Sequence, residues 1–513
     1  MSNLIIETGK QGFLTLKYQG KYLHSAIDPF KEATRLLPQN LDSSIYFVLG
    51  AGLGYHIQLL LEKIPTTSFV FVFEENLDIL KALKEHNPIQ DSRVHLFLNK
   101  DFSKFMKLFK KIVPFHLIQN PSYLELKSAT LLFATEYQKI KSHIREFLNY
   151  YLQSLFTEAE FSPLWYQNIL LNSPFIFNPK LSLYLEGGAI LVAAGPSLPK
   201  SFSLIKKLQK KAPVFAVDTA LKPLMEAGII PDVVVAADSQ IHNYKDFFHL
   251  SGLENMILAC DISVYHKIPP LFKKTFFFKT EELGDALFET ISKTEHISLP
   301  SFPGGGSVSS CALMLLHHLG AKKIVLIGQD LCYPHLTHSR GSIHFDRALY
   351  SSDKTSPVWN FFNNIRQKRG YQDLFMQNLT RWIGDFISLS NIEVYQIEPQ
   401  IAIQNALRSI PDVFKGHLYA FDKLKHNQKN RKLFFNSFLS LFLKLRKASS
   451  ALELNEIRET SLFSAILKNL FMRQDLYLNR KGGDEVLFLG GCFKIADRLI
   501  KTLKILLKQE EEN

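Results

Sequence analysis

The sequence predicts an α/β protein with two parallel-sheet units followed by a C-terminal helical region. Three observations lead to this prediction. Short apolar runs rich in Val, Ile and Phe alternate with segments of helical spacing, as in βαβ units. Glycine or acidic residues follow several of these runs, where each strand is expected to end. From residue 405 onward, apolar residues recur at helical spacing. We therefore predict two Rossmann-like units and a helical bundle over 405–513.

The composition is that of an ordinary globular protein of two or three domains, with 513 residues, 46% of them hydrophobic. A net charge of +12 favours an anionic partner, or reflects a lysine-rich solvated surface. The four cysteines form no CxxC pair, which argues against a disulfide framework or structural zinc. Neither a signal-peptide pattern nor a membrane-spanning apolar stretch is evident, so we expect a cytoplasmic protein.

Residues 1–125 form the first predicted unit, with a β-rich start. An apolar run over 45–49 precedes a glycine turn over 50–54, and a second strand over 69–73 ends at Glu74. This order resembles the first motif of a Rossmann-type methyltransferase, in which an acidic residue holds a ribose. Tight strand-to-helix packing also requires glycine without any ligand, so both interpretations stay open. Residues 126–184 are predicted to be a helical connector.

The second unit, residues 185–404, begins with strands expected over 189–194, 214–217 and 233–237. Each is followed by a polar tip. The three tips are Gly195-Pro196-Ser197, Asp218-Thr219 and Asp238-Ser239. Because parallel strands end at one edge of the sheet, these tips should lie where open α/β sheets bind ligands. Backbone N–H groups of the turn at Gly195, which starts a helix, suit a phosphate.

Two later segments of this unit also carry polar groups. A loop containing Gly305 and Ser307 leads into a helix over 311–319, and it is a candidate anion cradle but no Walker A motif. A strand over 323–327 then precedes a polar loop just past the strand end, the expected position for chemistry. The residues of interest there are Gly328, Asp330, Tyr333, His335, His338, Arg340 and His344.

Taken in order, these motifs resemble the motility accessory factor (Maf) glycosyltransferases, whose central domain is similar to 6-hydroxymethylpterin pyrophosphokinases of the MptE type. The resemblance runs from residue 45 to the region of residue 400. It rests on GLGYH at 52–56, GPSL at 195–198, VDTAL at 217–221, GIIPD at 228–232, GGGSV at 304–308 and GQDLCY at 328–333, with His338.

The resemblance implies a cytoplasmic enzyme that glycosylates Ser or Thr of flagellin before export, and so serves flagellum assembly and motility. The donor would be a CMP-activated nonulosonic acid of the pseudaminic or legionaminic type. The central domain is similar to bacterial sialyltransferases. No further cofactor, metal, nucleic acid or membrane span is expected, and a homo-oligomer is left open. One departure concerns the family's closing glycine-rich segment, because residues 396–403 hold Glu398 but no glycine.

The resemblance also implies roles for individual residues. His338 is the expected general base, since an imidazole titrates near neutrality, with His335 and His344 as alternatives. Asp330 and Tyr333 are expected beside the donor, where Tyr333 can donate to the leaving phosphate. The expected donor-binding residues are Gly195, Pro196, Ser197, Asp218, Thr219, Asp238, Gly305, Ser307, Gly328 and Arg340, joined by Ser309. Helix caps and tight turns are the competing structural roles for several of them.

Two other function classes fit the same residues. A 6-hydroxymethylpterin diphosphokinase would use ATP and Mg²⁺, with Asp218 and Asp238 as ligands. A non-catalytic scaffold that binds flagellin would keep only a degenerate nucleotide site. The regions at both ends of the chain favour a protein substrate over a pterin.

Overall fold

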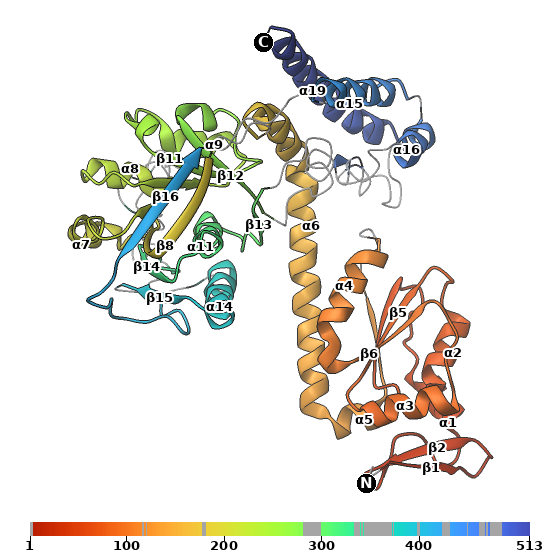
Figure 1. Ribbon diagram of the computed structural model, residues 1–513. Helices are drawn as coiled ribbons and strands as arrows, with labels where there is room; N and C mark the ends of the chain where they lie inside the picture. The colour runs from red at the N-terminus through yellow and green to blue at the C-terminus, as the bar shows by residue number, and fades with distance from the viewer. Residues whose placement is uncertain are drawn as a thin grey trace, which may run out of the picture. The chain divides into compact units, whose positions relative to one another are not determined.

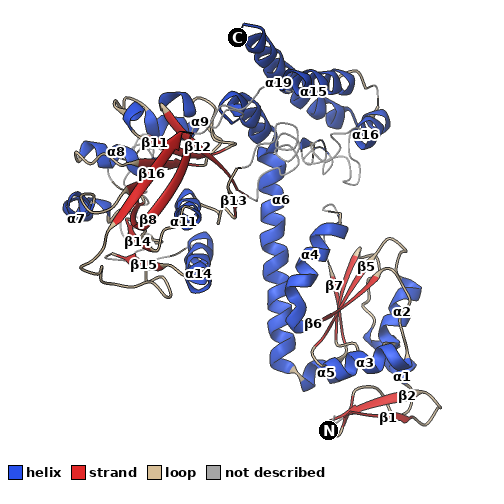
Figure 2. Cartoon of the chain, viewed as in Figure 1, coloured by secondary structure: helices blue, strands red, loops and turns tan. Residues whose placement is uncertain are grey.

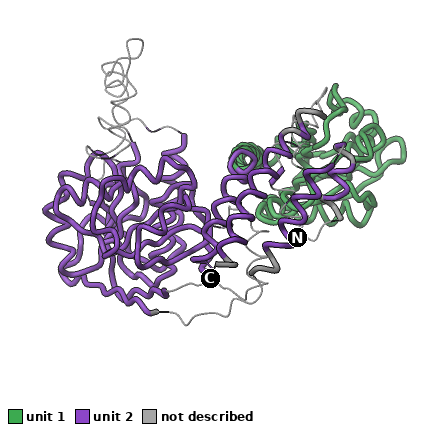
Figure 3. Tube along the Cα trace, turned by 90° about the horizontal axis from the view of Figure 1, so that it is seen from above, with its two compact units in different colours: residues 1–157, 479–481 green, residues 158–478, 482–513 purple. Residues whose placement is uncertain are grey.

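The computed structural model describes residues 4–512 except 115–116, 119–120, 177–180, 281–298, 333–338, 340–341, 343–371, 373, 398–400, 423–430, 449, 461–466, 468–469, 472–473 and 475–484. The chain divides into two compact units, in the main residues 1–157 and residues 158–513 (Figure 3). No helix within the described ranges is long and apolar enough to cross a bilayer.

Unit 1 contains two small sheets. An antiparallel sheet comprises β1 (Leu4–Thr8), β2 (Leu14–Tyr18) and β3 (Lys21–Tyr22). A parallel sheet has the order β6-β5-β4-β7, with β4 (Ile45–Leu49), β5 (Phe69–Glu74), β6 (Val94–Leu98) and β7 (Ser122–Glu125). The helices of the unit are α1 (Pro29–Leu36), α2 (Tyr55–Lys63), α3 (Leu77–His86), α4 (Phe102–Ile112), α5 (Lys127–Leu132) and the first part of α6 (Ala134–Ile176).

Phenylalanine fills the core between the parallel sheet and α4. Phe105 contacts Phe47 and Phe73 edge to face, with ring centroids 6.0 and 5.1 Å apart, and Phe109 packs on Phe71 at 5.3 Å. Edge-to-face pairs of this kind add to the free energy gained by burying the rings. Much of the phenylalanine content of unit 1 therefore stabilises its interior.

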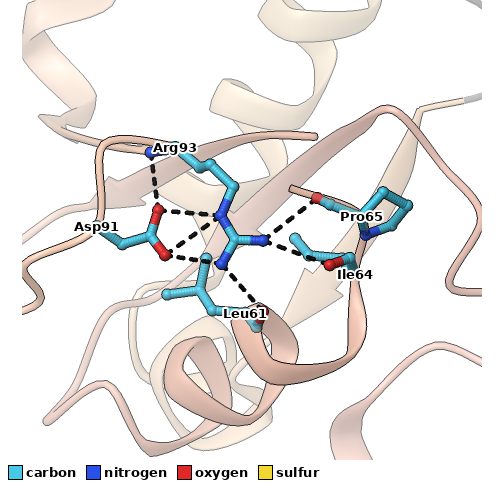
Figure 4. A network of polar contacts seen from close by, with 5 residues as sticks. All are labelled: Leu61, Ile64, Pro65, Asp91 and Arg93. Atoms are coloured by element: carbon cyan, nitrogen blue, oxygen red, sulfur yellow. Dashed lines mark hydrogen bonds and ion pairs between the residues drawn. The ribbon is translucent and has the colours of Figure 1, made fainter. Parts of the chain in front are cut away.

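Arg93 closes the C-terminal end of α2 (Figure 4). Its guanidinium donates to the carbonyl oxygens of Leu61 at 3.0 Å, Ile64 at 3.3 Å and Pro65 at 3.2 Å. It also donates to both carboxylate oxygens of Asp91, which lowers the pKa of that carboxyl group. Carbonyl groups at a helix end lack partners within the helix, so a single planar cation satisfies several at once.

Unit 2 is built on one large sheet with helices around it (Figure 1, Figure 2). The strand order is β13-β12-β11-β10-β9-β8-β14-β15, all parallel, and β16 pairs antiparallel with β8. The strands are β8 (Leu181–Val192), β9 (Val214–Val217), β10 (Val233–Ala236), β11 (Ile257–Asp261), β12 (Lys274–Thr280), β13 (Ser301–Phe302), β14 (Lys323–Ile327), β15 (Glu393–Gln396) and β16 (Gly416–Asp422).

Helices follow most of these strands, as parallel crossovers require. They are α7 (Phe202–Leu208), α8 (Asp218–Glu226), α9 (Ile241–Tyr244), α11 (Val308–His318) and α14 (Leu374–Leu389). The C-terminal helices are α15 (Arg431–Leu445), α16 (Ala451–Thr460) and α19 (Glu485–Glu512). Their buried residues join the far end of α6 and residues of β10 to β12 in one apolar core.

The predicted fold class of two parallel α/β units with C-terminal helices is confirmed. The expectation that residues 405–513 are helical is wrong at β16, whose stability comes from pairing with a strand far away in the sequence. α6 is a single helix of 43 residues that passes through Pro163 and Pro174. The predicted domain boundaries at 125, 184 and 404 stay predictions.

Candidate functional site

The candidate site lies where the strand order of unit 2 reverses. β9 pairs with one side of β8 and β14 pairs with the other, and ligands of open α/β sheets bind at the carboxyl edge beside such a reversal. Here the Gly195 N–H donates to Gly328 O at 2.8 Å, and the Ser197 N–H donates to Asp330 Oδ2 at 2.8 Å. The structure therefore brings these four predicted residues together.

Both glycines are required by this close approach. A Cβ atom on Gly195 would overlap the Gly328 carbonyl oxygen and the Asp330 carboxylate. Gly328 adopts φ +72°, which favours glycine, and a Cβ there would overlap the carbonyl oxygen of Ala193. The glycines thus allow the loops after β8 and β14 to touch through their backbones.

The backbone amides of the turn at Gly195 are already paired. Gly195 and Ser197 donate as described, the Leu198 N–H donates to Gly195 O at 3.0 Å, and Pro196 has no N–H. In this structure the amides donate to the protein's own acceptors, and the predicted phosphate cradle stays a prediction. Within the described residues, the side-chain groups at this place that could contact a ligand are the hydroxyl of Ser197 in the turn and the carboxylate of Asp330 beside it.

Ser339 joins the polar loop to the same turn. Its N–H donates to Ala194 O at 2.8 Å, and the side chain is fully buried. In the sequence Ser339 stands between His338 and Arg340. His338, Arg340 and Tyr333 lie outside the described residues, as do His335, His344 and Glu398, so their roles stay predictions.

A cluster of carboxyl groups lies at the ends of β9 and β10. Asp218 Oδ1 accepts from the Thr219 N–H at 2.7 Å, and Asp218 Oδ2 accepts from Asn243 Nδ2 at 2.6 Å. Burial raises the pKa of Asp218 to about 7, and the charge of Asp238 contributes. Burial raises the pKa of Asp246 to about 8, with contributions from Asp218 and Asp238. Two carboxyl groups here titrate near neutrality, as is common at functional sites.

The sequence interpretation placed Asp218, Thr219 and Asp238 correctly at this edge but missed two neighbours. Asn243 lies in the short helix α9 and Asp246 lies just after it, a few residues beyond the predicted strand-end tip Asp238-Ser239, and no motif in the sequence singles them out. Asp218 is the first residue of α8 rather than its N-cap, which is Val217. The structure therefore does not bear out the helix-cap alternative for Asp218.

Two buried asparagines on α6 hold the neighbouring loops. Asn168 Nδ2 donates to Ser239 O at 2.9 Å and to Ser263 O at 3.1 Å, and Asn168 Oδ1 lies 3.1 Å from His266 Nδ1. Asn172 Nδ2 donates to the carbonyl oxygens of residues 262 and 264 at 3.1 and 2.8 Å. Because Ser239 adjoins Asp238, α6 positions the loop that carries this one member of the acidic cluster.

The predicted anion cradle before α11 is a helix cap in the structure. Ser307 Oγ accepts from the Ser310 N–H at 3.1 Å, and the Ser307 N–H donates to Ser310 Oγ at 3.0 Å. This reciprocal pair is a capping box. Gly305 has φ +66°, and a Cβ there would overlap Trp382. No described contact tests donor binding by Gly305 or Ser307.

The glycine turn of unit 1 is filled by the protein's own side chains. The Ala51 N–H donates to Glu74 Oε2 at 2.8 Å, and the Leu53 N–H donates to His24 Nε2 at 2.7 Å. A Cβ on Gly52 would overlap the His24 ring. Glu74 is fully buried and also accepts from the Asn76 N–H and the Tyr137 hydroxyl. These contacts support the structural role that the sequence left open for this turn.

Within the described ranges, no group of three or more His, Cys, Asp or Glu side chains is arranged to hold a metal ion. The acidic cluster nevertheless supplies the oxygen ligands that Mg²⁺ prefers.

The fold and the switch-point site together define a doubly wound α/β protein with a second Rossmann-like unit. Over its whole length the chain has the fold of the MAf glycosyltransferase from Magnetospirillum magneticum AMB-1. The two structures align with a TM-score of 0.60 and 15% identity, over 100% of this chain and 93% of the other. The predicted resemblance in fold is thereby confirmed.

The central segment matches a sequence family as well. The 6-hydroxymethylpterin diphosphokinase MptE-like family model matches residues 167–335. A 6-hydroxymethyl-7,8-dihydropterin pyrophosphokinase of Methanocaldococcus jannaschii is 27% identical over 191 residues, which cover 36% of this chain and 75% of that protein. The predicted MptE-like segment is therefore present.

Two uncharacterized proteins of Treponema pallidum (strain Nichols) are also similar. One is 32% identical over 119 residues, or 23% of this chain, and the other is 23% identical over 385 residues, or 70% of this chain. The matches span 57% and 65% of those relatives, less than two thirds of their length.

Proposed function

We propose that this protein is a glycosyltransferase that transfers a nonulosonic acid from a CMP-activated donor to Ser or Thr hydroxyls of flagellin. The observation that supports it most is the contact of Ser197 with Asp330 at the reversal of strand order, in a chain with a MAf glycosyltransferase fold. Transfer would take place in the cytoplasm before flagellin export, and flagellum assembly and motility would depend on it. A homo-oligomer is compatible with this role.

In this proposal, residues at this edge of the sheet have three tasks, which are donor binding, general base catalysis and contact with the anionic groups of the donor. Ser197 and Asp330 bind the donor through their hydroxyl and carboxylate groups, with Asp218 and Thr219 beside them at the end of β9. His338 acts as the general base and removes the proton of the acceptor hydroxyl. The acceptor oxygen bonds to the anomeric carbon of the sugar as the bond from that carbon to the CMP phosphate breaks. Tyr333 donates to the leaving phosphate, and Arg340 pairs with an anionic group of the donor.

The anchoring of Ser339 to Ala194 supports this assignment, because it fixes the residue between His338 and Arg340 beside the turn at Gly195. Asp330 accepts a backbone N–H, so its carboxylate is held in a defined direction. Asp330, Ser339 and the turn at Gly195 thus belong to one edge of one sheet.

Intact-mass analysis of flagellin tests the proposal. Flagellin made with this protein and a CMP-nonulosonate supply should be heavier by whole nonulosonate residues, and the His338→Ala variant should lose the added mass. His86→Ala, at an exposed position of α3 in unit 1, is the matched control and should keep it. If His338→Ala with Asp330→Ala retains full function, the protein is a scaffold and not an enzyme.

A second candidate is a 6-hydroxymethylpterin diphosphokinase, which the family match over 167–335 and the acidic cluster favour. Asp218 and Asp238 would then hold Mg²⁺, which in turn would bind the phosphates of ATP. Incubation with 6-hydroxymethyl-7,8-dihydropterin, ATP and Mg²⁺ separates the two. Formation of the pterin diphosphate, together with unmodified flagellin in the mass analysis, would favour the kinase.

A further inference from the structure

β16 and the first half of β8 form a two-stranded ribbon that extends the large sheet (Figure 2). Their register pairs Tyr419 with Tyr184 and Leu418 with Leu185. Among the described strands, β16 pairs with β8 alone, so its other side is an edge. Such an edge presents a row of backbone donors and acceptors that can pair with another chain.

Two hydrogen bonds show which backbone groups face that edge. The Leu185 N–H donates to Leu319 O at 2.8 Å, away from β16, and the Gly416 N–H donates to Lys211 O at 3.0 Å, away from β8. Pairs in an antiparallel ladder alternate between hydrogen-bonded and non-hydrogen-bonded. Leu418 and Ala420 have the same parity as Gly416, so their N–H and C=O groups point to the outer edge.

The two faces of the ribbon differ sharply. Leu181, Leu183 and Leu185 are buried in the main core of unit 2. The opposite face is aromatic, with Tyr184 54% and Phe421 57% exposed. Tyr419 lies between them, with its ring centroid 6.2 Å from each, and His417 packs on Tyr419 at 4.5 Å. A strand added at the edge would have these rings beside its own side chains.

Exposed lysines gather where β16 begins. Backbone hydrogen bonds place three of them there. The carbonyl oxygen of Lys211 accepts from the Gly416 N–H, that of Lys415 accepts from the Gly188 N–H at 2.8 Å, and the Lys322 N–H donates to Gly187 O at 2.8 Å. All three lysine side chains are exposed and form no ion pair within the described residues. One carboxylate, Glu186, stands on the aromatic face and accepts from the Tyr419 hydroxyl at 3.0 Å.

We propose that the outer edge of β16 is a docking site for an extended acidic peptide segment of another protein. The segment adds to the sheet as a strand, bonds to the backbone groups of Leu418 and Ala420, and lays alternate side chains on the aromatic face. The lysines attract its carboxylates. A second copy of this chain is the less suitable occupant because each copy carries a net charge of +12.

Fluorescence anisotropy on the full chain tests the site with a labelled short peptide of alternating Glu and Val. The Ala420→Pro variant removes one outward N–H without touching the ladder to β8, as proline does on edge strands. Affinity should fall at least roughly tenfold in this variant. Ala420→Val is the matched control, which keeps the N–H group, and should bind as the wild type does.

Control peptides, a second variant and sedimentation exclude a folding defect of Ala420→Pro and a second copy of the chain as explanations. A peptide with Lys in place of Glu, or one N-methylated at alternate residues, should not bind. Lys211→Glu with Lys415→Glu should weaken binding and flatten its salt dependence even if Ala420→Pro fails to fold. The proposal is overturned if the acidic peptide does not bind, or if Ala420→Pro folds and binds it unchanged. It is also overturned if sedimentation shows a dimer that Ala420→Pro dissociates. The test is independent of the reaction at the switch-point site.

Discussion

The two units each carry a glycine turn after a buried strand, yet the turns serve different ends. At 50–54 in unit 1, the amides are taken by Glu74 and by His24, both buried and both from the same unit. At Gly195 in unit 2, the partner of the Ser197 N–H is Asp330, which comes from the loop across the reversal of strand order. A glycine turn therefore marks close packing, and its neighbours decide whether a site can form beside it.

The largest expected effect comes from Gly195→Val. The new side chain would collide with the Gly328 carbonyl oxygen, which belongs to the backbone, and with the Asp330 carboxylate, which the Ser197 N–H holds in place. We expect a loss of about 3 kcal/mol in the free energy of unfolding and no detectable transfer. Gly228→Ala is the comparison, because its Cβ would lie in open space, with Lys206 Nζ the nearest atom at 3.9 Å. Its φ of +69° should cost about 1 kcal/mol, and transfer should be unaffected. Urea unfolding and the flagellin mass assay measure both effects, and a stable, active Gly195→Val protein would contradict the close approach.

The second prediction concerns the stability of unit 1 at acid pH. Burial lowers the pKa of His24 to about 3 and that of His56 to about 4. Below the ordinary histidine pKa, both histidines become protonated in the unfolded chain but stay neutral in the folded unit. The free energy of unfolding therefore falls as pH falls. From pH 7 to pH 5 each histidine should cost about 2 kcal/mol.

The His24→Gln variant should show about half of this histidine-linked loss. Hydrogen exchange of peptides covering β4 and β5, corrected for intrinsic rates, reports the stability of unit 1 in the full chain. Glu74, whose pKa burial raises, acts in the opposite direction in both proteins and cancels in the comparison. An identical pH response in wild type and variant would show that His24 is not the proton-linked group.

Unit 2 should respond to pH with the opposite sign at its acidic cluster. The pKa of Asp218 is raised to about 7, so its contribution to stability is complete at acid pH and is lost as pH rises through 7. The Asp218→Asn variant should therefore gain about 2 kcal/mol over wild type between pH 5 and pH 8. Exchange of peptides covering β9 and β10 measures the gain. Loss of CMP affinity in the same variant would place Asp218 at the donor, whereas unchanged affinity would leave it outside the site.

The smallest effect is expected for Ser307→Ala. Loss of the capping box of α11 should cost about 1 kcal/mol, measured by thermal unfolding. Because the Ser307 hydroxyl is used by the Ser310 N–H, CMP affinity should stay unchanged. A large drop in CMP affinity, measured by calorimetry, would instead confirm the donor-binding role predicted from the sequence.

Among the parallel strands, the sequence predicted β4, β5, β9, β10, β14 and the second half of β8, because their apolar runs are local and end in visible turn residues. It also placed Gly195, Ser197, Gly328 and Asp330 at one edge, since parallel topology alone brings strand ends together. It missed β16, whose partner Leu181–Gly187 lies more than two hundred positions away, with no hairpin between them. It missed the contact of His24 with Leu53, because a side chain entering from a distant hairpin leaves no periodic signal.

The same limit applies to the groups around Asp218. Asn243 reaches it from a short helix beyond the next strand, and only folding shows that the two are neighbours. From the sequence alone, the backbone amides at Gly195 are expected to be available to a phosphate. A sequence pattern cannot show that a carbonyl oxygen and a carboxylate from the loop after β14 already accept hydrogen bonds from them.

The length of α6 has a practical consequence for dissecting the chain. Any fragment beginning at residue 185, where the sequence alone suggests a domain start, discards Asn168 and Asn172 and leaves the carbonyl oxygens of the loops after β10 and β11 without their donors. The segment that matches the MptE-like family starts at residue 167, one position before the first of these asparagines. A minimal folding unit for the central sheet therefore begins inside a helix, and expression limits should be set by the turns of α6 rather than by the start of β8.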